Sequence, residues 1–255
     1  MGWGFDGKMS TMASKLLAHG AHVTSVDNKL GELLWLSPVA KLDGPGAIRG
    51  GVPIIGPWFA ALTGQEPKHG WARVSQWQLI DDATARITKD GLELQVVVVD
   101  HATGFTMTYS ARNVGDESRK IQLAFHPYFR VADVEKVTVS GVDGADVYDA
   151  VTKTHVTQQG DLTFTAGEYD RITRGGDYEY VISDPGLRRR IIVSSSAADS
   201  VVVWNPGENT IADIGDEWRH FVCVEPALLG EDYQGVVVEP GGNRTISLTV
   251  QAEAF

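Results

Sequence analysis

Hydrophobic residues recur along this chain in short runs that are β-branched or that alternate with polar residues, whereas the spacing of an amphipathic helix is scarce. Turn signals separate the runs, for example at 89–91, 184–186 and 240–243. Strands that follow one another without intervening helices favour an antiparallel sandwich or barrel over an α/β fold. The expected strands lie at 21–26, 32–36, 75–80, 85–89, 92–100, 105–114, 120–129, 134–142, 178–183, 189–196, 200–206, 220–226, 235–240 and 244–253.

The number and spacing of these runs predict an all-β protein with one large antiparallel β-sandwich. The chain has 255 residues, enough to bury a sizeable core, and no low-complexity linker divides it. We therefore expect a single domain over residues 1–255. No repeat of fixed period is visible, which disfavours a propeller. Residues 1–20 contain no clear first strand, so we expect poor order there.

The formal net charge of −11 argues against a nucleic acid or an anionic membrane surface as the main partner. A small anionic substrate stays compatible with this charge, because a few converging arginines can dominate the field inside a pocket. No run approaches 18 consecutive apolar residues, and the N-terminus lacks the pattern of a secretory signal. By default, we expect a cytoplasmic protein without a transmembrane helix.

The single cysteine, Cys223, excludes an internal disulfide and a zinc site built from several cysteines. It lies in the apolar run FVCVEP, so we interpret it as a core residue rather than a nucleophile.

Two glycine-containing segments are not explained by strand formation. In AIRGGVPIIGPWFA (47–60), Arg49 precedes a glycine pair that allows unusual backbone dihedrals or close approach to a ligand, although a structural loop explains the pattern as well. In PKHGWARVSQW (67–77), His69, Trp71 and Arg73 alternate. In an extended segment they share one face, which suits a polar ligand with an apolar flank or, alternatively, a solvent-exposed strand edge. Lys68 is expected to be a solvated surface lysine.

Two further polar residues stand at apolar strands. LAFHPYF (123–129) places His126 at or near a strand end, where a histidine is often a hydrogen-bonded structural residue. In VCVEPA (222–227), Glu225 closes an apolar strand, with Pro226 as a possible stop signal. A carboxylate is costly to bury unless it is paired or hydrogen-bonded, so Glu225 is the more informative of the two.

Together, RGGVP, PWF, HGWAR, HPYF, YDRI, VVWNP and FVCVEPA resemble the aldose 1-epimerase superfamily, and most of all its glucose-6-phosphate 1-epimerase (hexose-6-phosphate mutarotase) branch. The motifs follow the order of the family and span residues 49–227. The resemblance implies the galactose mutarotase-like β-supersandwich. Two departures concern the shape of the pocket: Pro127 follows His126 where the family more often has Thr or Ser, and Gly56 stands where it often has Phe.

The resemblance also implies a role for individual residues. His126 matches the catalytic acid and Glu225 the catalytic base, while His69 matches a histidine that hydrogen-bonds the sugar near the reacting centre. The implied substrate-binding residues are Asp170 for sugar hydroxyls, Arg49 and Arg73 for the phosphate, and Trp204 near the sugar.

The implied reaction is the exchange of α and β anomers of a hexose 6-phosphate by acid–base ring opening and reclosure, with neither a cofactor nor a metal. The expected partner is a small sugar phosphate, and a monomer is favoured over an obligate oligomer. Three alternatives remain: a mutarotase for unphosphorylated aldoses, a non-catalytic carbohydrate-binding or regulatory protein, and a glycoside hydrolase that uses Asp170 and Glu225.

Overall fold

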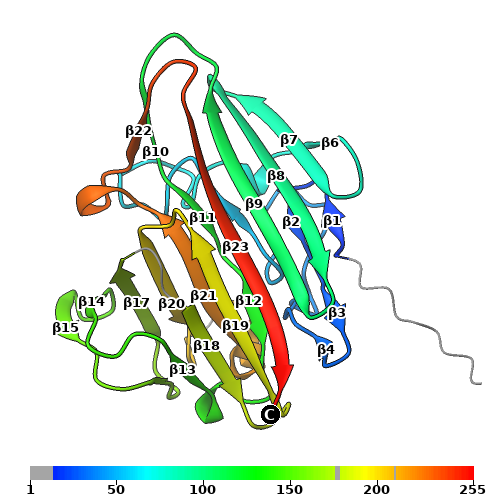
Figure 1. The fold of residues 1–255 in the computed structure, drawn as a ribbon, viewed down its shortest axis with the longest axis vertical. Coiled ribbons are helices and arrows are strands. Elements are labelled where there is room, and N and C mark those ends of the chain that lie inside the picture. Colours follow the sequence, from blue (N-terminus) through cyan, green and yellow to red (C-terminus); the bar gives the residue numbers. More distant parts are fainter. Residues whose placement is uncertain (1–13, 176–178, 210) are drawn as a thin grey trace, which may run out of the picture.

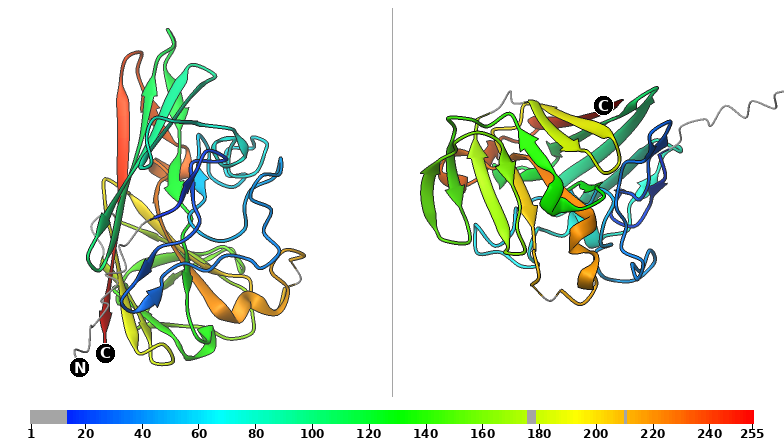
Figure 2. Two further views of the ribbon diagram at one scale, coloured as in Figure 1. Left: turned by 90° about the vertical axis from the view of Figure 1, so that its right-hand side faces the viewer. Right: turned by 90° about the horizontal axis from the view of Figure 1, so that it is seen from below.

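Two large antiparallel sheets dominate the computed structural model, which describes residues 14–175, 179–209 and 211–255 (Figure 1). Residues from both sheets, such as Val96 and Tyr109 from one and Phe125 and Val224 from the other, meet in one buried cluster. The predicted all-β sandwich is confirmed. Seen from the side in Figure 2, the long strands form one layer, and the N-terminal segments lie over one face of it.

The larger sheet has nine strands in the order β16-β13-β18-β19-β23-β9-β8-β7-β6. Burial alternates along β8 and β9, because one face packs on the core and the other meets solvent. This alternation is the signal that located these strands in the sequence. The bounds are β6 Gln78–Leu79, β7 Thr84–Lys89, β8 Leu92–His101, β9 Gly104–Asn113, β13 Thr138–Ser140, β16 Leu162–Thr163, β18 Glu179–Asp184, β19 Arg189–Ser196 and β23 Asn243–Ala254.

The second sheet has eight strands: the path β15-β14-β17-β20-β21-β11-β5, and β12, which also pairs with β21. Every residue of β21 is buried, so this strand is covered on both faces. One face packs on the main core, and the other carries a smaller apolar cluster that includes Ile55, Ala124 and Val202. The bounds are β5 Ile54–Ile55, β11 Leu123–Phe125, β12 Tyr128–Arg130, β14 Asp146–Asp149, β15 Thr154–Thr157, β17 Tyr169–Arg174, β20 Ser200–Asn205 and β21 Phe221–Leu228.

Short strand pairs and single 3-10 turns make up the remaining elements. The pairs are β1 Leu16–Leu17 with β2 His22–Val23, β3 Asp27–Asn28 with β4 Gly31–Glu32, and β10 Arg119–Ile121 with β22 Val236–Val238. The turns are η1 Ala72–Val74, η2 Val134–Lys136, η3 Gly215–His220 and η4 Glu231–Tyr233. None of the helices in the described ranges is long and apolar enough to cross a membrane. We expected poor order over residues 1–20, and residues 1–13 of that segment lie outside the described residues.

Three of the expected strands differ in the structure. The run 120–129 forms three strands, β10, β11 and β12, because Gln122 leaves the ladder and its side chain binds backbone groups of three loop residues. In the run 32–36, β4 ends at Glu32, and beyond it Leu34 and Leu36 form only isolated bridges. The run 134–142 begins with the 3-10 turn η2 and becomes a strand only at β13.

Arg189 connects the hairpin formed by β3 and β4 to the nine-stranded sheet. Its side chain is buried in β19, and its guanidinium donates to the carbonyl oxygens of Leu30, Glu32 and Arg130 at 2.8–3.0 Å. We expect Arg189→Leu to lower the free energy of unfolding by about 3–4 kcal/mol, because three partly buried carbonyls lose a charged donor. Chemical denaturation measures the loss.

The matched control is Arg190→Leu. Arg190 is the next residue along β19, and its guanidinium makes two contacts at the surface, an ion pair with Glu253 and a contact over the ring of Phe255. Arg190→Leu should lower the free energy of unfolding by less than about 1 kcal/mol. Equal losses in the two variants would contradict the role given to Arg189.

Candidate functional site

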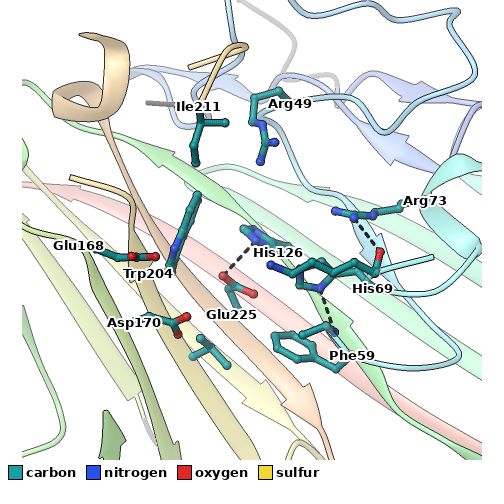
Figure 3. Close-up of a pocket in the computed structure, with 13 residues that line it drawn as sticks. Arg49, Phe59, His69, Arg73, His126, Glu168, Asp170, Trp204, Ile211 and Glu225 are labelled. Atoms are coloured by element: carbon teal, nitrogen blue, oxygen red, sulfur yellow. Dashed lines mark hydrogen bonds and ion pairs between the residues drawn. The ribbon is translucent and has the colours of Figure 1, made fainter. Parts of the chain in front are cut away.

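A cavity of about 270 Å³ lies on the outer face of the eight-stranded sheet (Figure 3). All seven residues singled out in the sequence line it: Arg49, His69, Arg73, His126, Asp170, Trp204 and Glu225. They come from sequence segments far apart in the chain. The structure thus brings the seven together, while the role of each stays a prediction.

Strand register places His126 beside Glu225. β11 and β12 pair with β21 in one common register, with Ala124 opposite Ala227 and Tyr128 opposite Cys223. In that register His126 falls opposite Glu225, at the interruption between β11 and β12. The backbone N–H of His126 leaves the ladder there and donates to Pro53.

The expectation that β21 ends at Glu225 is wrong. The strand continues through Pro226 to Leu228. Proline has no N–H to donate, and Pro226 lies beside the interruption between β11 and β12, where the ladder on that side is open. Glu225 therefore projects from the middle of a rigid, fully buried strand rather than from a strand end.

The two side chains form a close, buried pair. Nε2 of His126 lies 3.3 Å from Oε1 of Glu225, and the side chains are 9% and 2% exposed. Burial raises the pKa of Glu225 well above its usual range, and Asp170 raises it further. Burial lowers the pKa of His126 well below its usual value, with Arg73 and Arg49 adding to the effect. Burial thus disfavours both charged forms, and favours a carboxylic acid beside a neutral imidazole.

Each member of the pair has one polar atom left over. Nδ1 of His126 and Oε2 of Glu225 are buried and lack a hydrogen-bond partner among the described residues. Buried polar atoms are nearly always hydrogen-bonded, and an exception calls for an explanation such as a bound ligand or water. Both atoms suit a ligand that offers a hydroxyl group.

Aromatic rings hold the His126 imidazole in place. Tyr128 stacks on it with ring centroids 4.9 Å apart and an interplanar angle of 13°. Trp204 and His69 meet it edge to face at 5.6 and 5.8 Å. A ring fixed on several sides keeps its nitrogen atoms aimed at one place, which acid–base chemistry requires.

His69 has a defined tautomer. Its Nδ1 accepts the backbone N–H of Ala60 at 3.2 Å, so in the neutral ring Nε2 carries the proton and can donate it to a ligand. Burial, followed by the charge of Arg73, keeps the pKa of His69 far below its usual value. Gly70 secures this turn, because a Cβ there would lie 2.0 Å from the carbonyl oxygen of Gly56.

The expected extended segment 67–77 is wrong. His69 has a φ of 68°, and η1 begins at Ala72, so the chain turns rather than alternates. As a result Trp71 packs in the main core, while His69 and Arg73 face the cavity. The favourable contacts of each residue, rather than a shared strand face, decide where it points.

Cations gather on one side of the cavity (Figure 3). Arg49 donates to the hydroxyl of Tyr128 at 2.9 Å and forms an ion pair with Asp213 at 3.1 Å. Arg73 donates to the carbonyl of Lys68 at 2.8 Å. Lys68 is exposed, as expected, but lines the cavity too.

Carboxylates lie on the opposite side (Figure 3). Asp170 in β17 pairs with Trp204 in β20, so both project from the same face of the sheet. Burial, and then the charge of Glu168, raises the pKa of Asp170 to about 6. Glu168, which sequence reasoning missed, also lines the cavity and accepts a hydrogen bond from Asn209. The sequence offered one signal for Glu168: it lies two residues before Asp170, and residues with this spacing share a face in an extended segment.

The ligand atoms of His126, Cys223 and Glu225 lie within 4.8 Å of one another, close enough for a metal. Burial raises the pKa of the Cys223 thiol well above its usual value, and the charge of Glu225 adds to this. The protonated thiol is a poor metal ligand. A metal at this cluster would have to displace the thiol proton of Cys223.

Comparison with known proteins identifies the relatives of this chain. Residues 7–251 match the family model described as "Aldose 1-epimerase". A "Putative glucose-6-phosphate 1-epimerase" of Escherichia coli (strain K12) is 34% identical over 78% of this chain and 74% of the relative. A protein of the same description from Cenchrus ciliaris is 29% identical over 87% of this chain and 79% of its own. The solved structure of a "putative mutarotase" from Salmonella typhimurium superposes with a TM-score of 0.79 at 27% identity, over 93% of this chain and 86% of its own.

The burial of Glu225 predicts a pH-dependent gain in stability for Glu225→Gln. Because the folded-state pKa of Glu225 is raised, the wild-type protein loses stability as the pH rises through that pKa. Glutamine does not titrate, so the variant should gain about 1–3 kcal/mol over wild type at alkaline pH and little below pH 5. Denaturant titrations across pH measure this difference. A variant that is less stable than wild type by the same amount at every pH would contradict it.

Proposed function

We propose that this chain, which belongs to the aldose 1-epimerase family, interconverts the α and β anomers of a hexose 6-phosphate. Family membership makes it an isomerase that acts on a sugar. The observation that carries the finer proposal is the buried pair of His126 and Glu225 at 3.3 Å, inside a cavity whose opposite sides carry cations and carboxylates. The size of the cavity suits one sugar ring.

Anomer exchange opens a cyclic hemiacetal and closes it from the other face. Glu225 takes the proton of the C1 hydroxyl, the bond between C1 and the ring oxygen breaks, and His126 gives a proton to that oxygen. Rotation about C1–C2 then exposes the other face of the carbonyl, and reclosure reverses both transfers. The pair holds one proton throughout, which lies on His126 in the closed form and on Glu225 in the open form.

Without substrate, His126 and Glu225 favour the protonation state that the mechanism assigns to the ring-opened sugar. Burial favours the proton on Glu225 rather than on His126. At 3.3 Å, the proton can pass directly between Nε2 and Oε1 when a sugar binds. Catalysis therefore needs bound substrate to favour the imidazolium.

The remaining side chains suit the two ends of a sugar phosphate. The Nε2–H of His69 can donate to a sugar oxygen beside the reacting centre, and Asp170 can accept sugar hydroxyls. Trp204 offers an apolar face for the ring. Arg49 and Arg73 present the planar donors that suit phosphate oxygens.

One observation favours a second candidate, a mutarotase for unphosphorylated aldoses. Arg49 already binds Asp213 and Tyr128, so its place is explained without a phosphate. Arg73 weighs the other way, because its contact with Lys68 engages only a backbone carbonyl and its Nε is buried without a hydrogen-bond partner among the described residues.

The direct test is anomer exchange of glucose 6-phosphate, followed by magnetisation-transfer NMR with glucose in parallel. We expect faster exchange of the phosphate ester, and a loss of about 10²–10⁴-fold in Glu225→Gln and in His126→Asn. Thermal denaturation checks that each variant is folded. Near-normal turnover in either variant would remove that residue from the mechanism, and exchange of glucose alone would support the second candidate.

Substrate class is tested by Arg73→Gln. Losing a charged donor to phosphate should reduce kcat/KM for glucose 6-phosphate by about 10–100-fold, without a comparable loss for glucose. The control is Arg86→Gln, because Arg86 is exposed on β7 of the other sheet and its guanidinium donates to Gln95. Equal losses on both sugars would show that Arg73 is structural.

A further inference from the structure

The position of His126 conflicts with its proposed task. A proton donor to the ring oxygen must carry a positive charge, yet His126 shares its cavity with the three cations Arg49, Arg73 and Lys68. It is also almost completely buried. Like charges and burial both oppose the imidazolium form.

The cations reach His126 from two directions. The guanidinium of Arg49 donates to the hydroxyl of Tyr128, whose ring stacks on the imidazole. On another side, the ring of His69 meets the imidazole edge to face, and His69 is adjacent in sequence to Lys68. The backbone carbonyl of Lys68 in turn accepts from Arg73.

These cations are incompletely neutralised. Arg49 forms an ion pair with Asp213. Over the described ranges, neither Arg73 nor Lys68 forms an ion pair with a carboxylate. The titratable and charged groups around His126 are Glu225 and Cys223 from β21, Tyr128 from β12, Asp170 and Glu168 at β17, and His69, Lys68, Arg73 and Arg49 from the segments that flank β5.

The charge balance explains which groups oppose protonation. After burial, Arg73 and Arg49 are the largest causes that lower the pKa of His126, and Lys68 contributes too. Glu225 lies nearest, but its own charge is disfavoured by burial. Asp213 pairs with Arg49, but among the described residues no carboxylate forms an ion pair with Arg73 or Lys68, so the cation side of the cavity lacks a second anion.

We propose that the phosphate of the substrate supplies that anion, and so converts His126 from a neutral imidazole into the proton donor. Its negative charge offsets Arg49, Arg73 and Lys68 at the moment when the sugar ring is in place. This inference rests on the proposed hexose 6-phosphate substrate. It gives the phosphate a part in turnover, in addition to its part in binding.

The size of the effect follows from electrostatics. At an effective dielectric constant of about 20, a unit charge several ångströms away changes a protonation equilibrium by about 10–100-fold. While the imidazolium is the minor form, the rate of ring opening rises in proportion to it. An anion supplied separately from the sugar should therefore activate the exchange of a free sugar.

The kinetic experiment measures anomer exchange of saturating glucose with and without inorganic phosphate, at an ionic strength held constant with chloride. We expect phosphate to raise kcat by about tenfold or more. Phosphate also catalyses the reaction in solution, so the rate without protein is subtracted at each phosphate concentration. His126→Asn then shows whether the remaining activation depends on His126. Inhibition of glucose turnover by phosphate, without any rise in kcat, overturns the inference.

The spectroscopic experiment follows the histidine ring signals by NMR across pH, with and without inorganic phosphate. His126→Asn assigns the signal, and the exposed His155 serves as an internal control. Phosphate should increase the protonated fraction of His126 about tenfold at a given pH and leave His155 unchanged. In Arg73→Gln, the protonated fraction of His126 should already be higher than in wild type without phosphate, and it should rise less when phosphate is added. If Arg73 were purely structural, its loss would not raise the protonated fraction of His126.

The outcomes separate the inference from the proposed function. If glucose 6-phosphate is exchanged but bound phosphate leaves the titration of His126 unchanged, the inference is wrong and the function stands. If glucose 6-phosphate is not exchanged at all, the proposed function fails, and the inference fails with it.

Discussion

A carboxyl group buried in the middle of an apolar strand is the constraint on which the site depends. Glu225 belongs to β21, whose residues are all buried. An isolated charge there is too costly to persist, so the group needs either a proton or a close partner. His126 is the close partner, with its Nε2 atom 3.3 Å from Oε1 of Glu225, and strand register places the two residues opposite each other.

The rest of the cavity is arranged around this pair by two kinds of support. The sheet provides Glu225, Trp204 and Asp170 from neighbouring strands, on one face. The turn around His69 provides the opposite wall, and its shape depends on Gly70, where a side chain would collide with the backbone of Gly56. Strands in fixed register and one tightly constrained turn thus set the geometry of the cavity.

The sequence predicted those parts of the molecule whose signals are local. Alternation in 92–100 and 105–114 gave β8 and β9, because a half-buried strand repeats every two residues. The prediction of one continuous strand over 120–129 was wrong, because the side chain of Gln122 and a long-range contact of His126 interrupt the ladder there.

At the site, the short motifs identified seven lining residues, because the resemblance to a family carries information about tertiary neighbours. Residues outside those motifs, such as Glu168, were not found. The position of Trp71 was also missed, because the direction of a side chain after a turn depends on contacts that no local pattern records.

The strand β23 lies between β19 and β9, in the middle of the nine-stranded sheet (Figure 1). Of the strands described, it is the one that leaves the ribosome after all the others. Until it arrives, β9 and β19 each have an open hydrogen-bonding edge, and such edges invite pairing between molecules. Biosynthesis of this protein therefore passes through a stage in which the two halves of the nine-stranded sheet are not yet joined, because the strand that pairs with both is synthesised last.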